Sequence, residues 1–178
     1  MSDKKFKLDE AQKYALSDYD IADYMCEPLH IVSYRDLARV QSIYDLLKDG
    51  YFVILYQMTK KMGHWVACID HGDYIEFFDS LGKCPDRTPE YAAREIGMQN
   101  YQTAKLLTKL LYDSGKDVIY NNIPLQGKDS NTCGRWVIGR IIMRDVPLEK
   151  FQLIFDNPHF TPDQIISMMI RVPYASSN

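Results

Sequence analysis

The sequence lacks the features that mark several large classes of protein. No apolar run approaches the ~18 residues that a membrane-spanning helix needs, and the basic N-terminal residues are not followed by the apolar segment of a signal peptide. Lys and Arg number 21 against 24 Asp and Glu, so a formal net charge of -3 leaves no overall basic field for nucleic acid or an anionic membrane. We therefore expect a protein that is neither secreted nor inserted in a membrane, and that does not require nucleic acid.

Metal and cofactor motifs are also scarce. There is no Gly-rich phosphate loop and no His-Glu-x-x-His zinc helix. Of the four scattered cysteines, Cys68 with His71 and Cys84 is the best zinc candidate, but no second paired ligand motif accompanies it. In a chain without an export signal, the spacing favours free thiols in a reducing compartment. We expect no metal and no cofactor.

Length and composition are those of one ordinary globular domain. The chain has 178 residues, 46% hydrophobic and 25% charged, with no repeat, linker or low-complexity tract. We expect a single domain over residues 1–178, acting as a monomer.

Three apolar runs in the middle of the chain predict a β-sheet. They cover 51–57, 64–70 and 74–79, and turn residues at 60–63 and 71–73 separate them, which favours an antiparallel meander. The first two runs are continuously apolar rather than alternating, so both faces of the sheet should be covered. A further short strand is predicted at 117–121. The expected fold is α+β, with a small central mixed or antiparallel sheet flanked by helices.

Helical patterns surround this sheet on both sides in the sequence. Ser17 with Asp20, and Thr161 with Gln164 after Pro162, have the spacing of helix-starting capping boxes. Together with apolar periodicity, these signals predict helices at 8–16, after Ser17, at 36–47, 89–96 and 101–112, from 132, and from 161.

Cys133 is the cysteine with the best setting for nucleophilic chemistry. It follows the polar loop 127–132 and opens a helical pattern, so its side chain should face the positive end of the helix dipole, which favours a thiolate. Gly134 beside it should leave room for a substrate backbone. The alternative is a small buried residue at a helix start, which is the commonest role of a free cysteine.

His64 and Asp79 supply a candidate base and its partner. His64 opens one predicted strand and Asp79 closes the next, so the turn between them should make the two residues cross-strand neighbours. A carboxylate fixes the tautomer of an imidazole and stabilises its cation. Gln126, in the loop before Cys133, carries an amide that could stabilise an oxyanion together with the N–H of Cys133. Taken singly, each residue also has a structural explanation.

In order, Gly63-His64-Trp65, the run 75–81 that contains Asp79, then Gln126 and Thr132-Cys133-Gly134 resemble the signature of the adenain-like and SUMO-protease-like cysteine peptidases. The resemblance covers about 51–144. It implies an adenain-type fold with the nucleophile at the start of a central helix. It also implies the roles of base for His64, orienting acid for Asp79, oxyanion-hole residue for Gln126 and nucleophile for Cys133.

Compact size and the run 132–137 resemble most the capsid-maturation proteases of adenoviruses, virophages and related double-stranded DNA viruses. This resemblance implies a cysteine endopeptidase that cleaves capsid precursors after small, Gly-type residues, in the virion or the host-cell cytoplasm. Adenovirus-type proteases are basic and use DNA as a cofactor, whereas this chain is mildly acidic. Two alternatives stay open: a peptidase or isopeptidase for a ubiquitin-like modifier, and an acyltransferase that uses the same His-Asp-Cys site.

Trp65 is the candidate substrate-binding residue. Because it directly follows His64, its indole should project beside the scissile bond and leave a channel that a glycine can thread and a bulky residue cannot. An inward, core position for Trp65 is the alternative.

Overall fold

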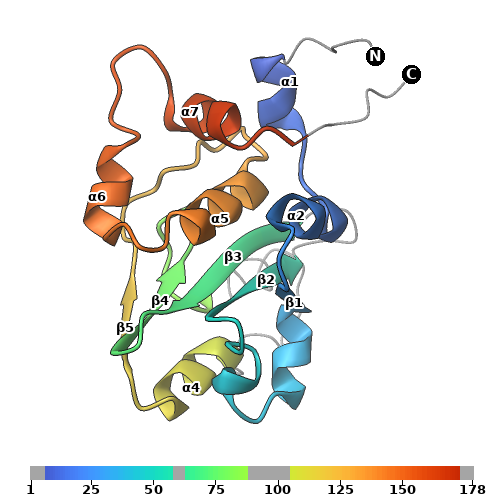
Figure 1. Cartoon of the computed structure of the whole chain (residues 1–178), viewed down its shortest axis with the longest axis vertical. Coiled ribbons are helices and arrows are strands. Elements are labelled where there is room, and N and C mark those ends of the chain that lie inside the picture. The colour runs from blue at the N-terminus through green and yellow to red at the C-terminus, as the bar shows by residue number, and fades with distance from the viewer. Residues whose placement is uncertain (1–6, 58–62, 88–104, 173–178) are drawn as a thin grey trace.

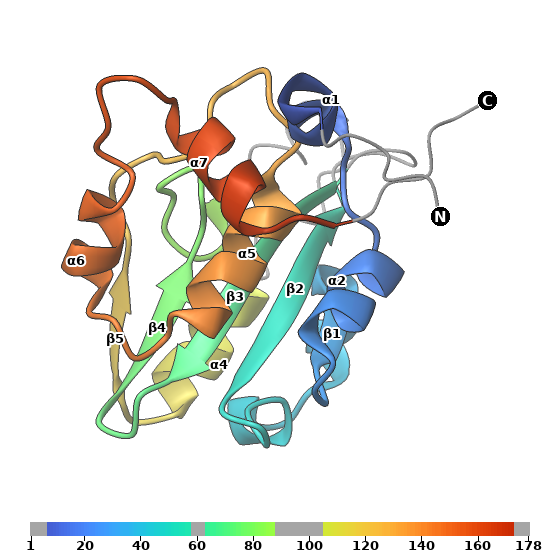
Figure 2. The same cartoon turned by 45° about the horizontal axis from the view of Figure 1, so that its top comes forward.

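The computed structural model describes residues 7–57, 63–87 and 105–172, and it contains a five-stranded sheet in the order β1-β2-β3-β4-β5. Antiparallel pairing joins β2, β3 and β4, while β1 runs parallel to β2 and β5 parallel to β4. The sheet is therefore mixed, and the predicted α+β class is confirmed (Figures 1 and 2). The strands are β1 His30–Ser33, β2 Tyr51–Gln57, β3 Gly63–Asp70, β4 Tyr74–Phe78 and β5 Asp117–Tyr120.

Helices cover both faces of the sheet, as the continuously apolar strands predicted. One face carries α5 (Cys133–Ile142), with α2 (Asp18–Met25), α6 (Leu148–Leu153), α7 (Pro162–Met169) and α1 (Leu8–Lys13) around it. The other carries α4 (Leu106–Asp113) and the 3₁₀ turn η1 (Tyr34–Arg39). In β3, Trp65 and Ala67 belong to the core on the α5 side, and Val66 and Cys68 to the core on the α4 side. Alternating side chains of one strand thus feed two separate cores.

Both capping boxes form as predicted. The Ser17 hydroxyl accepts from the N–H of Asp20 at the start of α2, and Thr161 does the same for Gln164 at the start of α7. The reciprocal bonds from each side chain back to the cap residue are also present, and Pro162 occupies the first turn of α7.

Other helix predictions need correction. The single helix expected at 36–47 is replaced by η1 and a second 3₁₀ turn, η2 (Ile43–Asp45), because Val40 is extended and Ser42 caps a new turn. The first helix ends at Lys13 rather than at residue 16, since Tyr14 is extended. The helix expected at 101–112 begins, in the described part, at Leu106, and the one at 89–96 lies outside the described residues.

Two short elements were not predicted. β1 spans four half-buried residues with no alternation to reveal it, and its partner β2 supplies the hydrogen bonds that make it a strand. α6 follows Pro147 and has six residues. Both are too short to leave a periodic signal.

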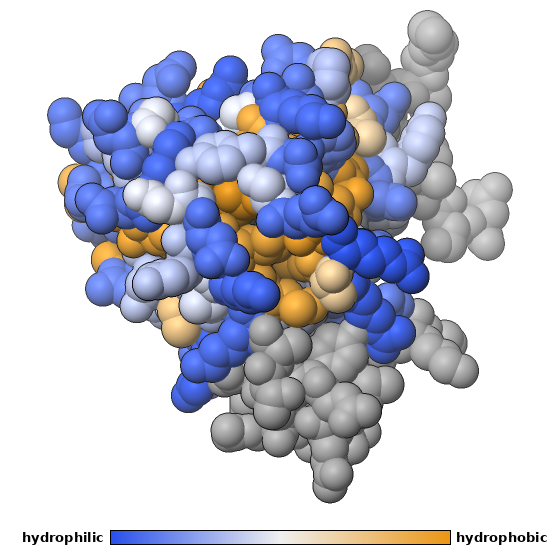
Figure 3. All heavy atoms as spheres, turned by 90° about the horizontal axis from the view of Figure 1, so that it is seen from below, coloured by the Kyte–Doolittle hydropathy of each residue, from blue (hydrophilic) through white to orange (hydrophobic). Residues whose placement is uncertain are grey.

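Within the described ranges, no helix is both long enough and apolar enough to cross a membrane. Seen from below, the molecule shows apolar side chains gathered among a majority of hydrophilic ones (Figure 3).

Candidate active site

The meander brings His64 and Asp79 together. β4 ends at Phe78, which pairs with Ala67, so Asp79 begins the turn beyond the strand, diagonal to His64 rather than directly opposite it. The His64 Nε2 and Asp79 Oδ1 atoms lie 2.7 Å apart. The two residues are only 4% and 0% exposed, so water weakens this contact little.

Asp79 is held rigidly by its neighbours. The Leu81 N–H donates to Asp79 Oδ1 at 2.8 Å. Asn121, which directly follows β5, binds the Asp79 main chain twice: its Oδ1 accepts from the Asp79 N–H at 3.0 Å, and its Nδ2 donates to the Asp79 carbonyl at 2.6 Å. Asn121 thus continues the β4–β5 pairing with a side chain. Sequence reasoning missed it, because an amide after a short strand has no distinguishing signal.

Cys133 is the first residue of α5, and its sulfur faces the His64 ring. Because His64 Nε2 is engaged by Asp79, the remaining nitrogen, Nδ1, serves the sulfur. The backbone N–H groups of Trp65 and Gly134 also favour the thiolate form of the sulfur and lower the pKa of Cys133. β4 stops short of the first residues of β3, which leaves the Trp65 N–H without a β4 partner and available to the sulfur.

This environment favours a thiolate–imidazolium pair. Burial alone would raise the pKa of the Cys133 thiol, but the hydrogen bonds from His64, Trp65 and Gly134 bring it below its ordinary value. Burial alone would lower the pKa of His64, but its bonds to Asp79 and Cys133 raise it from 6.5 to about 10. The two charges stabilise each other at neutral pH.

Gln126 is fixed by three hydrogen bonds to Ser80 and Ser130, none of which involves the sulfur. Its main-chain N–H donates to the Ser80 carbonyl, and its Oε1 accepts from the Ser80 hydroxyl at 2.7 Å. Its Nε2 donates to the Ser130 carbonyl at 2.9 Å. An amide nitrogen has two hydrogens, so one remains for a ligand. Through Ser80, Gln126 is tied to the residue that follows Asp79.

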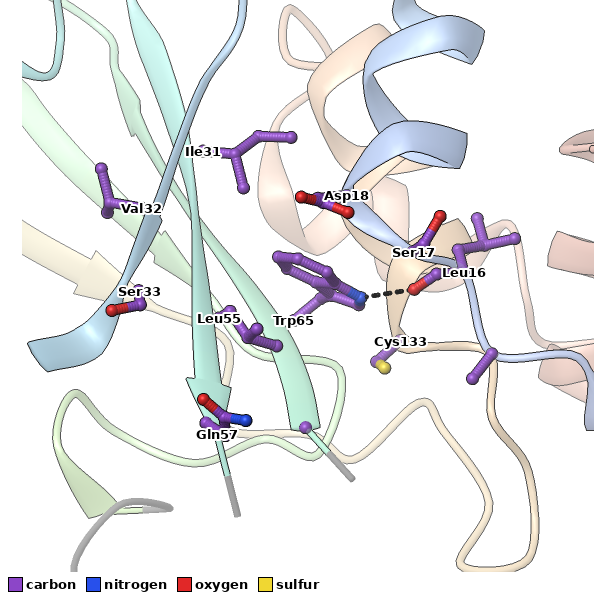
Figure 4. Close-up of a pocket in the computed structure, with 12 residues that line it drawn as sticks. Leu16, Ser17, Asp18, Ile31, Val32, Ser33, Leu55, Gln57, Trp65 and Cys133 are labelled. Atoms are coloured by element: carbon purple, nitrogen blue, oxygen red, sulfur yellow. Dashed lines mark hydrogen bonds between the residues drawn. The ribbon is translucent and has the colours of Figure 1, made fainter. Parts of the chain in front are cut away.

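Cys133 lines a groove of about 500 Å³ (Figure 4). Trp65 forms part of its wall, between β1 and the segment that leads into α2. Trp65 is 6% exposed and also belongs to the core, so its ring is both core and groove wall. The lining residues are Ala15, Leu16, Ser17, Asp18, Ile31, Val32, Ser33, Leu55, Gln57, Gly63, Trp65 and Cys133.

The N-terminal segment builds one side of this groove, which sequence reasoning did not predict. The Trp65 indole N–H donates to the Leu16 carbonyl at 2.8 Å, and Arg135 Nη1 donates to the Tyr14 carbonyl at 2.9 Å. Asn131 Nδ2 reaches the Lys13 carbonyl at 2.8 Å. In the sequence, the Trp65 donor directly follows His64, and the Asn131 and Arg135 donors lie on either side of Cys133. Main-chain carbonyls accept every bond, so no residue type in the segment announces them.

Gly134 does not leave room for a substrate, contrary to the expectation from sequence. A Cβ at this position would lie 2.8 Å from Leu16 Cβ, so the glycine allows the N-terminal segment to pack on α5. The close contact is therefore internal.

The zinc candidate does not assemble. Among the described residues no group of three or more His, Cys, Asp or Glu side chains could hold a metal ion. Cys68 lies fully buried in the core on the α4 side, and burial raises the pKa of its thiol far above the ordinary value.

The fold and the site define an α+β protein with a buried Cys-His-Asp arrangement at a helix N-terminus. No protein-family model matches the chain. A Sputnik virophage protein, "Uncharacterized protein V9", is 32% identical to it over 169 residues, which cover 89% of this chain and 95% of the virophage protein. The chain belongs to the family of this virophage protein.

Three solved structures are similar to the chain at low identity. A protease of ASFV has 15% identity and a TM-score of 0.49, with 91% of this chain and 68% of that chain covered. The SUMO protease Ulp1 has 16% identity and a TM-score of 0.43, covering 85% and 74%. ChlaDub1 from Chlamydia trachomatis has 14% identity and a TM-score of 0.42, covering 89% and 78%.

Cys133 should be alkylated selectively at mildly acidic pH. A thiolate is the reactive form, and the lowered pKa of Cys133 keeps it ionised at a pH where ordinary thiols, with pKa values of about 8.5, are protonated. We expect limited iodoacetamide treatment, read by peptide mass mapping, to modify Cys133 ahead of Cys26, Cys68 and Cys84. The preference should persist until the pH falls through the lowered pKa of Cys133.

His64→Ala is the matched control for this labelling, because it removes the strongest partner of the sulfur and leaves the helix start in place. The preference at acidic pH should disappear in that variant. Equal labelling of all four cysteines in the folded wild-type protein would contradict the assignment.

Proposed function

We propose that the protein is a cysteine endopeptidase that cleaves viral structural precursors after small residues. The observation that carries the proposal is the set Cys133, His64 and Asp79, whose Cys133 lines a groove. Such a set supplies nucleophile, general base and orienting carboxylate in one place. The relative in a virophage supports a viral setting, and within that setting we propose structural precursors as the substrates.

Each catalytic step has a residue to perform it. The Cys133 thiolate attacks the scissile carbonyl carbon, and the C=O electron pair moves to the oxygen. The Cys133 N–H and the remaining hydrogen of Gln126 Nε2 are the proposed donors to this oxyanion. The His64 imidazolium gives its proton to the leaving amine as the C–N bond breaks. His64 then takes a proton from water, which attacks the thioester and releases the carboxylate product and the sulfur.

The groove is the proposed site for the substrate residues that precede the scissile bond. Its walls near the sulfur are large and anchored: Trp65 is fixed by its bond to Leu16, and Leu16 packs on Gly134. At the start of β3, Leu55 lies against Gly63, where an added Cβ would approach within 2.5 Å of Leu55 Cδ1. We propose that these large, fixed side chains favour a substrate residue without a Cβ beside the sulfur.

The decisive experiment is incubation with virophage coat-protein precursors, followed by N-terminal sequencing of the fragments. Cleavage by the wild-type protein but not by Cys133→Ala, at sites preceded by small residues, would support the proposal. Cleavage only of ubiquitin-like modifier precursors or conjugates, offered in parallel, would favour the modifier peptidase instead.

Trp65→Ala should relax the preference for glycine before the cut. Removing the indole opens the groove wall next to Cys133 and also removes the bond to Leu16. In a peptide library varied at this position, we expect the wild-type protein to favour glycine and Trp65→Ala to accept larger residues as well. Selective alkylation of Cys133 in the variant checks that the site is still folded. Efficient wild-type turnover of peptides with Leu or Phe before the cut would refute a narrow channel beside Trp65.

A further inference from the structure

Asp163 is a buried carboxylate that the proposed reaction does not use directly. It is the second residue of α7, far from Cys133 in the sequence, and only 6% exposed. Asp163 Oδ2 accepts from the Gly127 N–H at 2.8 Å. Its Oδ1 accepts from the Trp136 indole N–H at 3.0 Å and from the Thr132 hydroxyl.

The three donors bracket the loop that leads to the nucleophile. Gly127 directly follows Gln126, and Thr132 directly precedes Cys133. Trp136 lies on the first turn of α5, fully buried in the core. A single carboxylate therefore ties both ends of the loop 127–132 to each other and to the helix that carries the sulfur.

We propose that Asp163 is a positioning residue that sets the geometry of the oxyanion donors. It fixes the loop at Gly127, and with it the side chain of Gln126. It also fixes Thr132, and with it the N–H of Cys133. The proposal rests on the proposed peptidase function and extends it to a residue on another helix.

A carboxylate suits this task because all three partners are donors. An ionised carboxylate only accepts, whereas an asparagine amide has one oxygen and a nitrogen that donates. In Asp163→Asn, the amide oxygen can still accept from Thr132 and Trp136. The NH₂ group then faces the Gly127 N–H, and two donors cannot form a hydrogen bond with each other. Gly127 also allows the close approach, since a Cβ there would lie 2.9 Å from Asp163 Oδ2.

The thiolate itself does not depend on Asp163. The groups that lower the pKa of Cys133 belong to His64, Trp65 and Gly134, whereas the hydrogen bonds of Asp163 go to Gly127, Thr132 and Trp136. Loss of the loop geometry should therefore slow acylation and leave the ionisation of Cys133 unchanged. A general loss of folding would change both.

The test compares Asp163→Asn with Gln164→Ala. The second variant removes the capping-box partner on the same turn of α7 but keeps the three bonds of Asp163, so it is a matched control for helix stability. On a Gly-site peptide we expect Asp163→Asn to lower kcat roughly 10- to 100-fold with little change in KM. The pH profile of Cys133 alkylation should match the wild type. Gln164→Ala should keep wild-type kcat.

Amide hydrogen exchange tests the same inference without any substrate. In Asp163→Asn, peptides spanning 126–133 should exchange faster than in the wild type, while the β2–β4 strands keep their protection. Unchanged exchange in that loop, or an unchanged kcat, would overturn the positioning role. So would a fall in kcat that Gln164→Ala reproduces, or an alkylation profile that shifts in Asp163→Asn. If the wild type cleaves no peptide but the loop exchange rises as expected, the proposed function fails and the loop anchoring stands.

Discussion

Cys133→Ala is expected to abolish peptide cleavage, the largest effect of any single substitution in the chain. The sulfur forms the bond to the substrate, and an alanine methyl group cannot form it. In serine proteases, loss of the nucleophile costs on the order of 10⁶ in kcat. The measurement is single-turnover cleavage of a Gly-site peptide at enzyme excess.

Cys68→Ala is the matched control for this substitution. It deletes the same atom from a fully buried site, but in the α4-side core, whereas Cys133 belongs to the α5-side core. It should lower the free energy of unfolding by about 1 kcal/mol and keep kcat. Measurable turnover by Cys133→Ala, or an inactive but folded Cys68→Ala, would place the nucleophile elsewhere.

The central strands could be predicted because their signal is local. The runs 51–57, 64–70 and 74–79 are apolar, rich in residues that favour strands, and separated by turn residues. The ends of β2, β3 and β4 differ from the ends of these runs by at most one residue. β1 could not be predicted in the same way. Its four half-buried residues become a strand only because β2 pairs with them, which is a tertiary effect.

The helix prediction for the segment 36–47 was wrong for a related reason. Its side chains suit a helix, but Leu37 and Ile43 are both buried on the α4 side, and two 3₁₀ turns with an extended Val40 between them reach this core from the strand β1. Packing therefore overrode propensity.

In the candidate site, the sequence singled out the residues proposed for the chemistry but not the residues that hold them in place. His64, Asp79 and Cys133 could be singled out because each stands at the start or end of a predicted element, and the structure brings all three together. Asn121 binds the main chain of Asp79, and Asp163 binds the Gly127 N–H and the side chains of Thr132 and Trp136, which are distant from it in sequence. Their partners exist only after folding, so no spacing reveals them.

Asp79→Asn should weaken the enzyme strongly but less than Cys133→Ala. Asp79 Oδ1 accepts from both His64 and the Leu81 N–H, so an asparagine oxygen in the same place keeps the geometry but loses the charge. Without that charge the pKa of His64 falls, the imidazolium is less populated, and the pKa of Cys133 rises in turn. The corresponding change in serine proteases costs about 10⁴ in kcat, which is our upper bound here.

Two measurements separate this electrostatic role from a structural one. The pH profile of Cys133 alkylation should move to higher pH in Asp79→Asn, because more base is needed to form the thiolate. Asp86→Asn is the matched control: Asp86 is equally buried and accepts from Tyr34 and Thr108, but in the α4-side core. It should lower the unfolding midpoint and leave the alkylation profile in place. Wild-type turnover in Asp79→Asn would mean that another acid orients His64.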